Sequence, residues 1–218
     1  MHDFNLIQLK ILFFLLLAQL PWVFIFWTIF KQRPLKDSIF LGLCGGLAVT
    51  ISIFYIFAAL GSFFLIPYWL LLTWIFSFIM LFKQHALFKN IKVKKAYLFW
   101  SVLGLIAIFY AIPVLSTDFP IGWDPTFHCL LARKIQYSGQ LAATWQPFEQ
   151  IAVNYPLGMH AFIAGLAYVT KAEPHIIFQT LHLPVMLLYS LGIYLIACKI
   201  FRNHTVGILA MVSFAFLT

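Results

Sequence analysis

The sequence predicts an all-α membrane protein, a polytopic bundle of six to seven transmembrane helices. Apolar residues make up 63% of its 218 residues and charged residues only 9%, against about 25% charged in an average soluble domain. Most of the apolar residues stand in runs of about the 20 residues that one crossing of a bilayer requires. The basic residues cluster between these runs, where charges that set membrane orientation belong.

Three apolar runs form the first predicted part of the chain, residues 1–96. They cover residues 11–30, 38–60 and 63–82. The second run carries Gly42, Gly45 and Gly46, and small residues at this spacing allow two membrane helices to approach closely. We therefore expect the second helix to pack tightly against a neighbour.

The segment from Lys83 to Lys95 is the strongest orientation signal, because it holds five lysines and no acidic residue. Loops of this kind stay in the cytoplasm. The fourth run, residues 96–115, then leaves on the opposite face. We therefore expect residues 116–156 to form a large non-cytoplasmic loop, with the N-terminus on the same side.

The path after residue 156 is open to two interpretations. Residues 157–170 are apolar but too few for a crossing, whereas 176–200 is long enough. If the short run crossed, Lys199 and Arg202 would lie outside the cytoplasm. If it were re-entrant or interfacial, both would lie inside, as basic residues prefer. The last run, 205–218, stops in mid-span, so we expect the chain to be a fragment of a longer protein, with 97–218 as its second part.

The net charge of +8 does not indicate a nucleic-acid partner, because the basic residues sit where they orient membrane helices and meet anionic head groups. The three cysteines also point to no special chemistry. Cys44, Cys129 and Cys198 are far apart, without the paired spacing of a zinc site or a redox pair.

The loop segment from Asp118 to His128 is polar, lies between long apolar runs and carries two of only six acidic residues. Asp124 followed by Pro125 is typical of a helix start, and Gly139 is typical of a helix end. The pattern between them predicts an amphipathic helix over 125–138 that lies along the membrane surface. His128 would then follow Asp124 by one turn on the same side.

Asp124 has two interpretations that do not exclude each other, because a carboxylate that caps a helix can also bind a cation or take a proton. Asp124 and His128 at this spacing form an oxygen–nitrogen pair suited to a divalent metal, with Asp118 as a possible third ligand. Farther on, Tyr155 suits the membrane interface, and His160 either makes a local hydrogen bond or lines a cavity shared with Asp124.

Two motifs together resemble the amino-terminal part of the GT-C superfamily of integral-membrane glycosyltransferases, and bacterial members most closely. The first runs from Asp124 to His128 as D-x-x-x-H, and the second from Tyr155 to His160 as Y-P-x-G-x-H. The resemblance covers residues 97–218, and the first three helices only loosely. Members of the superfamily have more helices than this chain.

The resemblance implies transfer of a sugar from a donor linked to a polyprenyl phosphate or pyrophosphate, at the non-cytoplasmic face of a bacterial inner (plasma) membrane. Asp124 would be the essential carboxylate, as general base or as metal ligand. His128, His160, Tyr155 and Arg133 would bind substrate. A divalent metal, Mg²⁺ or Mn²⁺, would be held by Asp124, Asp118 and His128.

Two other classes remain open. A transporter or flippase-like component would need ionisable groups inside the membrane, and His182 is the best candidate. A non-catalytic scaffold or gene remnant would agree with the abrupt end of the chain.

Overall fold

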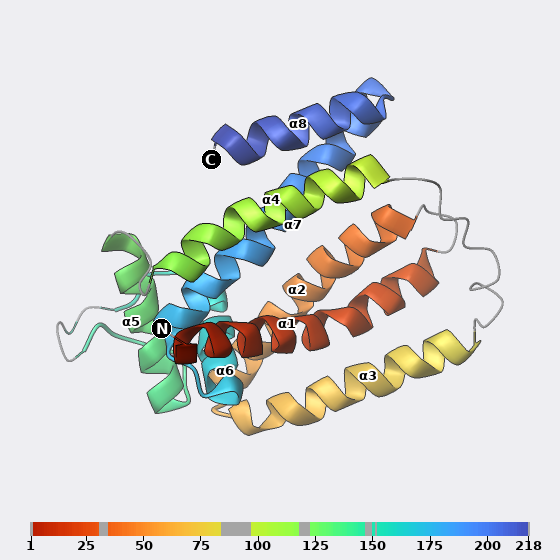
Figure 1. Ribbon diagram of the computed structural model, residues 1–218. Helices are drawn as coiled ribbons and strands as arrows, with labels where there is room; N and C mark the ends of the chain where they lie inside the picture. The colour runs from red at the N-terminus through yellow and green to blue at the C-terminus, as the bar shows by residue number, and fades with distance from the viewer. Residues whose placement is uncertain are drawn as a thin grey trace.

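A computed structural model describes residues 2–30, 35–83, 97–117, 123–146, 150 and 152–217, and it confirms the all-α fold (Figure 1). The elements are α1 (His2–Ile29), α2 (Leu35–Ala59), the short 3-10 helix η1 (Phe63–Leu65), α3 (Ile66–Lys83), α4 (Tyr97–Ser116), α5 (Trp123–Ser138), α6 (Gly158–Thr170), α7 (Pro174–Phe201) and α8 (His204–Leu217).

Within the described residues, five helices are long and apolar enough to cross a membrane. They cover Leu6–Ile29, Asp37–Ala59, Phe63–Phe82, Tyr97–Ser116 and Pro174–Phe201. Two shorter apolar helices, α6 and α8, account for the remaining predicted runs. Large hydrophobic side chains on the spanning helices are exposed on the outside of the bundle, which is the arrangement that a lipid environment favours.

Tight packing joins α2 to α1, as its glycines predict. A Cβ atom on Gly42 would overlap the backbone of Val23, and one on Gly46 would overlap Trp22. Absence of a side chain therefore sets the distance between these helices. On its other side, α1 is joined to α3 by the Trp74 indole, which donates a hydrogen bond to the Leu17 carbonyl over 3.0 Å.

Helices α4 and α7 run antiparallel along their whole length. Gln179, near the start of α7, donates to the carbonyl of Val114 at the end of α4 over 3.0 Å. At the other end, the rings of Phe99 and Tyr194 are 4.5 Å apart between centroids. Thus α7 begins at the end of the bundle where α4 finishes.

Helix α6 lies across the ends of the long helices, beside α5, rather than along them (Figure 1). It packs on the last turns of α2 through Phe54 and Phe162 and on η1 through Phe63 and Tyr168. Its 13 residues span only about 20 Å at 1.5 Å per residue, less than a bilayer core. Of the two paths predicted for the chain after residue 156, this placement agrees with the re-entrant or interfacial one, and the position of α6 relative to a membrane stays a prediction.

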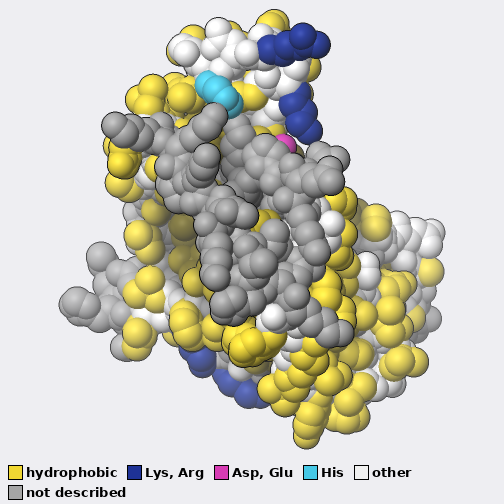
Figure 2. Space-filling model, turned by 90° about the vertical axis from the view of Figure 1, so that its right-hand side faces the viewer, with side chains coloured by type: hydrophobic (Ala, Val, Ile, Leu, Met, Phe, Trp, Pro, Cys, Tyr) yellow, Lys and Arg dark blue, Asp and Glu magenta, His cyan; other side chains and the backbone are white. Residues whose placement is uncertain are grey.

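The long helices have two unlike ends, which we call the α5 end and the basic end. The last turns of α1 and α3, the first turns of α2 and α4 and the α7–α8 corner all fall at the basic end. In the sequence, ten of the fourteen lysines and arginines lie in these turns or between the helices that they belong to, and only one acidic residue, Asp37, does. Figure 2 looks onto this end, where Lys and Arg side chains gather by the α7–α8 corner.

One core joins the two predicted parts of the chain, 1–96 and 97–218. Ile11 and Phe54 from the first part and Phe162 and Ile177 from the second are fully buried members of the same cluster. A second cluster, toward the basic end, packs α4, α7 and α8 together around Tyr194 and other residues. The site described below therefore rests on helices from both parts.

Gly165 provides a test of the packing under α6. A Cβ atom there would overlap the ring of Phe54, which is fully buried and has no room to move. Because overpacking of a filled core costs about 1–3 kcal/mol, Gly165→Ala should lower the thermal unfolding temperature in detergent micelles. Gly104→Ala is the matched control, since nothing lies within 4 Å of that position; equal melting temperatures for the two variants would contradict the packing.

Candidate functional site

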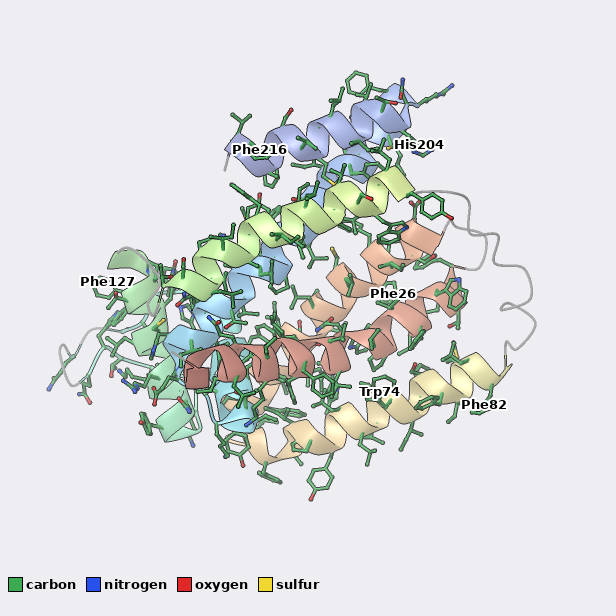
Figure 3. All side chains as sticks on the ribbon, viewed as in Figure 1. Phe26, Trp74, Phe82, Phe127, His204 and Phe216 are labelled. Carbon is green, nitrogen blue, oxygen red and sulfur yellow. The ribbon has the colours of Figure 1, made fainter. Side chains whose placement is uncertain are left out.

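Helix α5 forms as its sequence predicts and lies at one end of the molecule, where Phe127 projects from it in Figure 3. It ends at Gly139, whose φ of +69° is the left-handed conformation that glycine adopts without strain. Leu131 and Ile135 are buried against the core, while Tyr137 is 76% exposed. The prediction of an amphipathic helix over 125–138 is confirmed, with its apolar face on α6.

The chain after α5 doubles back and returns to the start of that helix. Thr144 pairs with Ala152 in an antiparallel bridge, and the Val153 amide donates to the Ala143 carbonyl over 3.0 Å. The Lys134 side chain donates to the Thr144 carbonyl and so fixes this loop to α5. The result is that residues 153–158 pass directly beside His128.

His128, Tyr155 and His160 meet in one cluster, which we call the histidine cluster. His128 Nδ1 and His160 Nε2 are 2.8 Å apart and form a direct hydrogen bond. The Tyr155 ring lies 5.5 Å from each imidazole, measured between centroids. Two motifs separated by about 30 residues in the sequence therefore converge on one place.

The side chains of the histidine cluster differ in how far they are exposed. His160 is 2% exposed, whereas Tyr155 is 48% exposed and borders a groove of about 630 Å³ shared with Ile51, Tyr55 and Ile56 of α2. Since Tyr55 and Ile56 are themselves exposed on the outside of the bundle, this groove connects the cluster with the lipid-facing surface of α2.

Burial keeps His160 neutral. Loss of water around the ring, reinforced by the neighbouring His128, lowers the pKa of His160 to about 4. The backbone of Pro156 raises the pKa of His160, although His160 Nδ1 makes no hydrogen bond of normal geometry. One imidazole nitrogen of the His128–His160 pair must donate and the other accept, so the pair carries at most one positive charge.

Two residues of the site are absent from the sequence prediction. Phe178 stacks on His128 with an angle of 12° between the rings, and the adjacent Gln179 holds the end of α4 by its bonds to Val114 and Thr117. A glutamine within an apolar run is a signal for such a role, because a buried amide needs partners. Nothing in the sequence points to Phe178 among so many aromatic residues.

Arg133 and Cys129 lie on α5 outside the histidine cluster. Arg133 forms an ion pair with Glu173, and both side chains are about half exposed. Burial raises the pKa of the Cys129 thiol to about 11, partly offset by Arg133, which disfavours the thiolate form that acts as a nucleophile.

The proposed carboxylates are only partly covered by the described residues. Asp124 lies in the first turn of α5, four residues before His128, but its side chain is outside the described part of the structure. Asp118 lies outside it altogether. Among the described residues, no three His, Cys, Asp or Glu side chains come together as a metal site would require.

Comparison with known proteins gives no match to a protein-family model, a curated protein or a solved structure. The function must therefore be argued from the histidine cluster, its surroundings and the two motifs that bring it together.

Acid should destabilise the fold through His160. Its pKa is lowered from 6.5 to about 4, so between these values the unfolded chain binds a proton that the folded chain does not. The free energy of unfolding is therefore highest above pH 6.5 and falls as the pH drops toward 4. The fall is on the order of 3 kcal/mol. Thermal unfolding across this pH range measures the loss.

The variant His160→Gln removes the titrating ring and should show a clearly shallower fall in melting temperature with acid. His182→Gln is the control, because His182 is exposed on α7 away from the cluster. Parallel pH curves for wild type and His160→Gln would contradict the assignment to His160.

Proposed function

We propose that this chain is a membrane glycosyltransferase of the GT-C type, or the amino-terminal portion of one. It would transfer a sugar from a polyprenyl-phosphate-linked donor to an acceptor at the α5 end. The observation that carries the proposal is the convergence of the D-x-x-x-H and Y-P-x-G-x-H motifs, through the 2.8 Å contact of His128 with His160.

The reaction requires a base, a phosphate-binding group and access for a lipid. Asp124 would take the proton of the acceptor hydroxyl, which needs hydrogen-bond reach to that hydroxyl. The acceptor oxygen would bond to the anomeric carbon of the sugar while the bond from that carbon to the phosphate oxygen breaks. The polyprenyl phosphate leaves with the electron pair.

The histidine cluster is suited to bind the phosphate. An imidazole N–H donates to phosphate oxygens, and a donor pre-oriented in a poorly hydrated site acts more strongly than one in water. The groove between Tyr155 and the lipid-facing side of α2 supports a donor that arrives from the bilayer. Arg133, engaged with Glu173, would contact the donor only at the edge of the site.

A divalent metal, if used, would neutralise charge on the departing phosphate. Its expected ligands were Asp124, Asp118 and His128. The Nδ1 atom of His128 is engaged by His160, and Mg²⁺ prefers oxygen ligands over imidazole. This set of ligand atoms fits Mg²⁺ poorly, so we assign no step of the reaction to a metal.

The orientation follows from charge. Because lysine- and arginine-rich segments stay in the cytoplasm, the basic end would be cytoplasmic and the α5 end non-cytoplasmic, in a bacterial inner membrane. The transporter alternative gains nothing from the described residues, since His182 is exposed at the surface of α7 rather than inside the bundle.

Asp124→Asn should abolish sugar transfer. Replacement of a general base lowers rates by about 10²–10⁴-fold, and the amide keeps the size and capping ability of the side chain. The assay measures transfer of radiolabelled sugar from polyprenyl phosphate in membranes that contain the full-length protein. Asp37→Asn, the same change at the basic end, should retain full activity.

Transfer that survives in Asp124→Asn would remove this residue from the mechanism. Transfer that is lost equally in Asp37→Asn would mean that the assay reports folding and not chemistry.

Membrane orientation can be tested with single cysteines at Gln140 and Asn203, which are both exposed and lie at opposite ends of the molecule. In intact cells, an impermeant thiol reagent should label Gln140→Cys from outside and should label Asn203→Cys only after permeabilisation. The opposite pattern would place the histidine cluster in the cytoplasm and rule out the proposed donor face.

A further inference from the structure

A partly open apolar cleft lies inside the bundle, and none of the three histidine-cluster residues lines it. It has a volume of about 300 Å³ and is bordered by α1, α2, α4 and α7, with Met159 and Phe162 of α6 at one end. Every lining side chain is apolar except that of Gln19. Helices α2 and α4, which form its side walls, make few direct backbone contacts with each other.

The size of the cleft decides among possible occupants. A transmembrane helix is about 10–12 Å across with its side chains, so it is far too large to fit into this cleft. An apolar cavity of about 150 Å³ is known to stay free of water and to bind benzene. A cleft of 300 Å³ therefore has room for a hydrocarbon chain of about a dozen carbon atoms, which is most of one acyl chain.

The position of the cleft indicates from which leaflet of the membrane an occupant would enter. Its walls extend from Met159 and Phe162 of α6 to Ile39 and Leu43 in the first turns of α2 and Phe99 and Trp100 in the first turn of α4, so one end of the cleft reaches the basic end. An amphiphile whose chain fills the cleft would have its head group at that end.

Positive charge is available for that head group. Lys199 lies on the same face of α7 as Leu188 and Leu191, which line the cleft, because these positions recur at helical spacing. It is exposed and about 12 Å beyond Leu191 along the helix axis. Arg202, also exposed, follows at the α7–α8 corner, and Asp37 is the one acidic residue in this region.

We propose that the cleft holds one acyl chain of an anionic phospholipid from the leaflet at the basic end, with its phosphate at Lys199 and Arg202. The lipid completes the packing between α2 and α4. This site is separate from the histidine cluster and does not depend on glycosyl transfer.

The test uses the purified chain, stripped of lipid in detergent, with phosphatidylglycerol, phosphatidylcholine of the same acyl chains, or polyprenyl phosphate added. Phosphatidylglycerol should raise the melting temperature by about 5 °C at saturation, clearly more than phosphatidylcholine. Native mass spectrometry should show one phosphatidylglycerol bound per chain.

Two matched tryptophan variants locate the effect. Leu103 lines the cleft, and Leu103→Trp should fill it and abolish the stabilisation. Leu105, two residues along the same helix, is 66% exposed, and Leu105→Trp should respond like wild type. Should Leu103→Trp fail to fold, Lys199→Gln combined with Arg202→Gln tests the same site from the surface and should remove the preference for phosphatidylglycerol.

The proposal is overturned if both phospholipids stabilise equally, or if neither does. It is also overturned if the response is the same in both tryptophan variants. Stabilisation by polyprenyl phosphate alone, lost in Leu103→Trp, would replace the acyl chain by a polyprenyl chain and likewise refute the assignment.

Discussion

The need to satisfy backbone carbonyls where water is scarce shapes the α5 end of this protein. The last carbonyls of a helix have no partner within it, and hydrocarbon offers none. Gln8 of α1 and Gln179 of α7 both donate to the carbonyl of Val114 near the end of α4, and Lys10 donates to the carbonyl of Thr170 at the end of α6 over 2.7 Å. These bonds tie α1, α4, α6 and α7 together at one level.

This network explains how a short helix comes to carry a site. Lys10 satisfies a carbonyl in the last turn of α6, which stops at Thr170 and lies crosswise to the long helices. Lying crosswise, it presents His160 to the face of α5 that carries His128. Gln179 holds α7 in register with the end of α4, and the preceding residue, Phe178, thereby reaches the ring of His128.

The sequence was sufficient to predict the five long apolar helices, the amphipathic helix α5 and the glycine contacts of α2, because each depends on local length, periodicity or the absence of a side chain. Motif resemblance also suggested that His128 and His160 belong together. The orientation of α6 stayed open, since length alone does not separate a tilted span from an interfacial helix. Pairing of Arg133 with Glu173, 40 residues away, depends on tertiary structure that no local pattern reveals, and the role of Asp124 stays a prediction.

The two ends of the bundle differ in charge. Ten basic residues are attached to one end, and lysine and arginine bias the orientation of membrane helices while acidic residues contribute little. The α5 end is thus under no demand to carry positive charge, and five of the six acidic residues fall in segments attached to it. Acidic groups beside a bilayer are retained there without disturbing topology. A neutral His160 adds polarity to the histidine cluster without burying a charge.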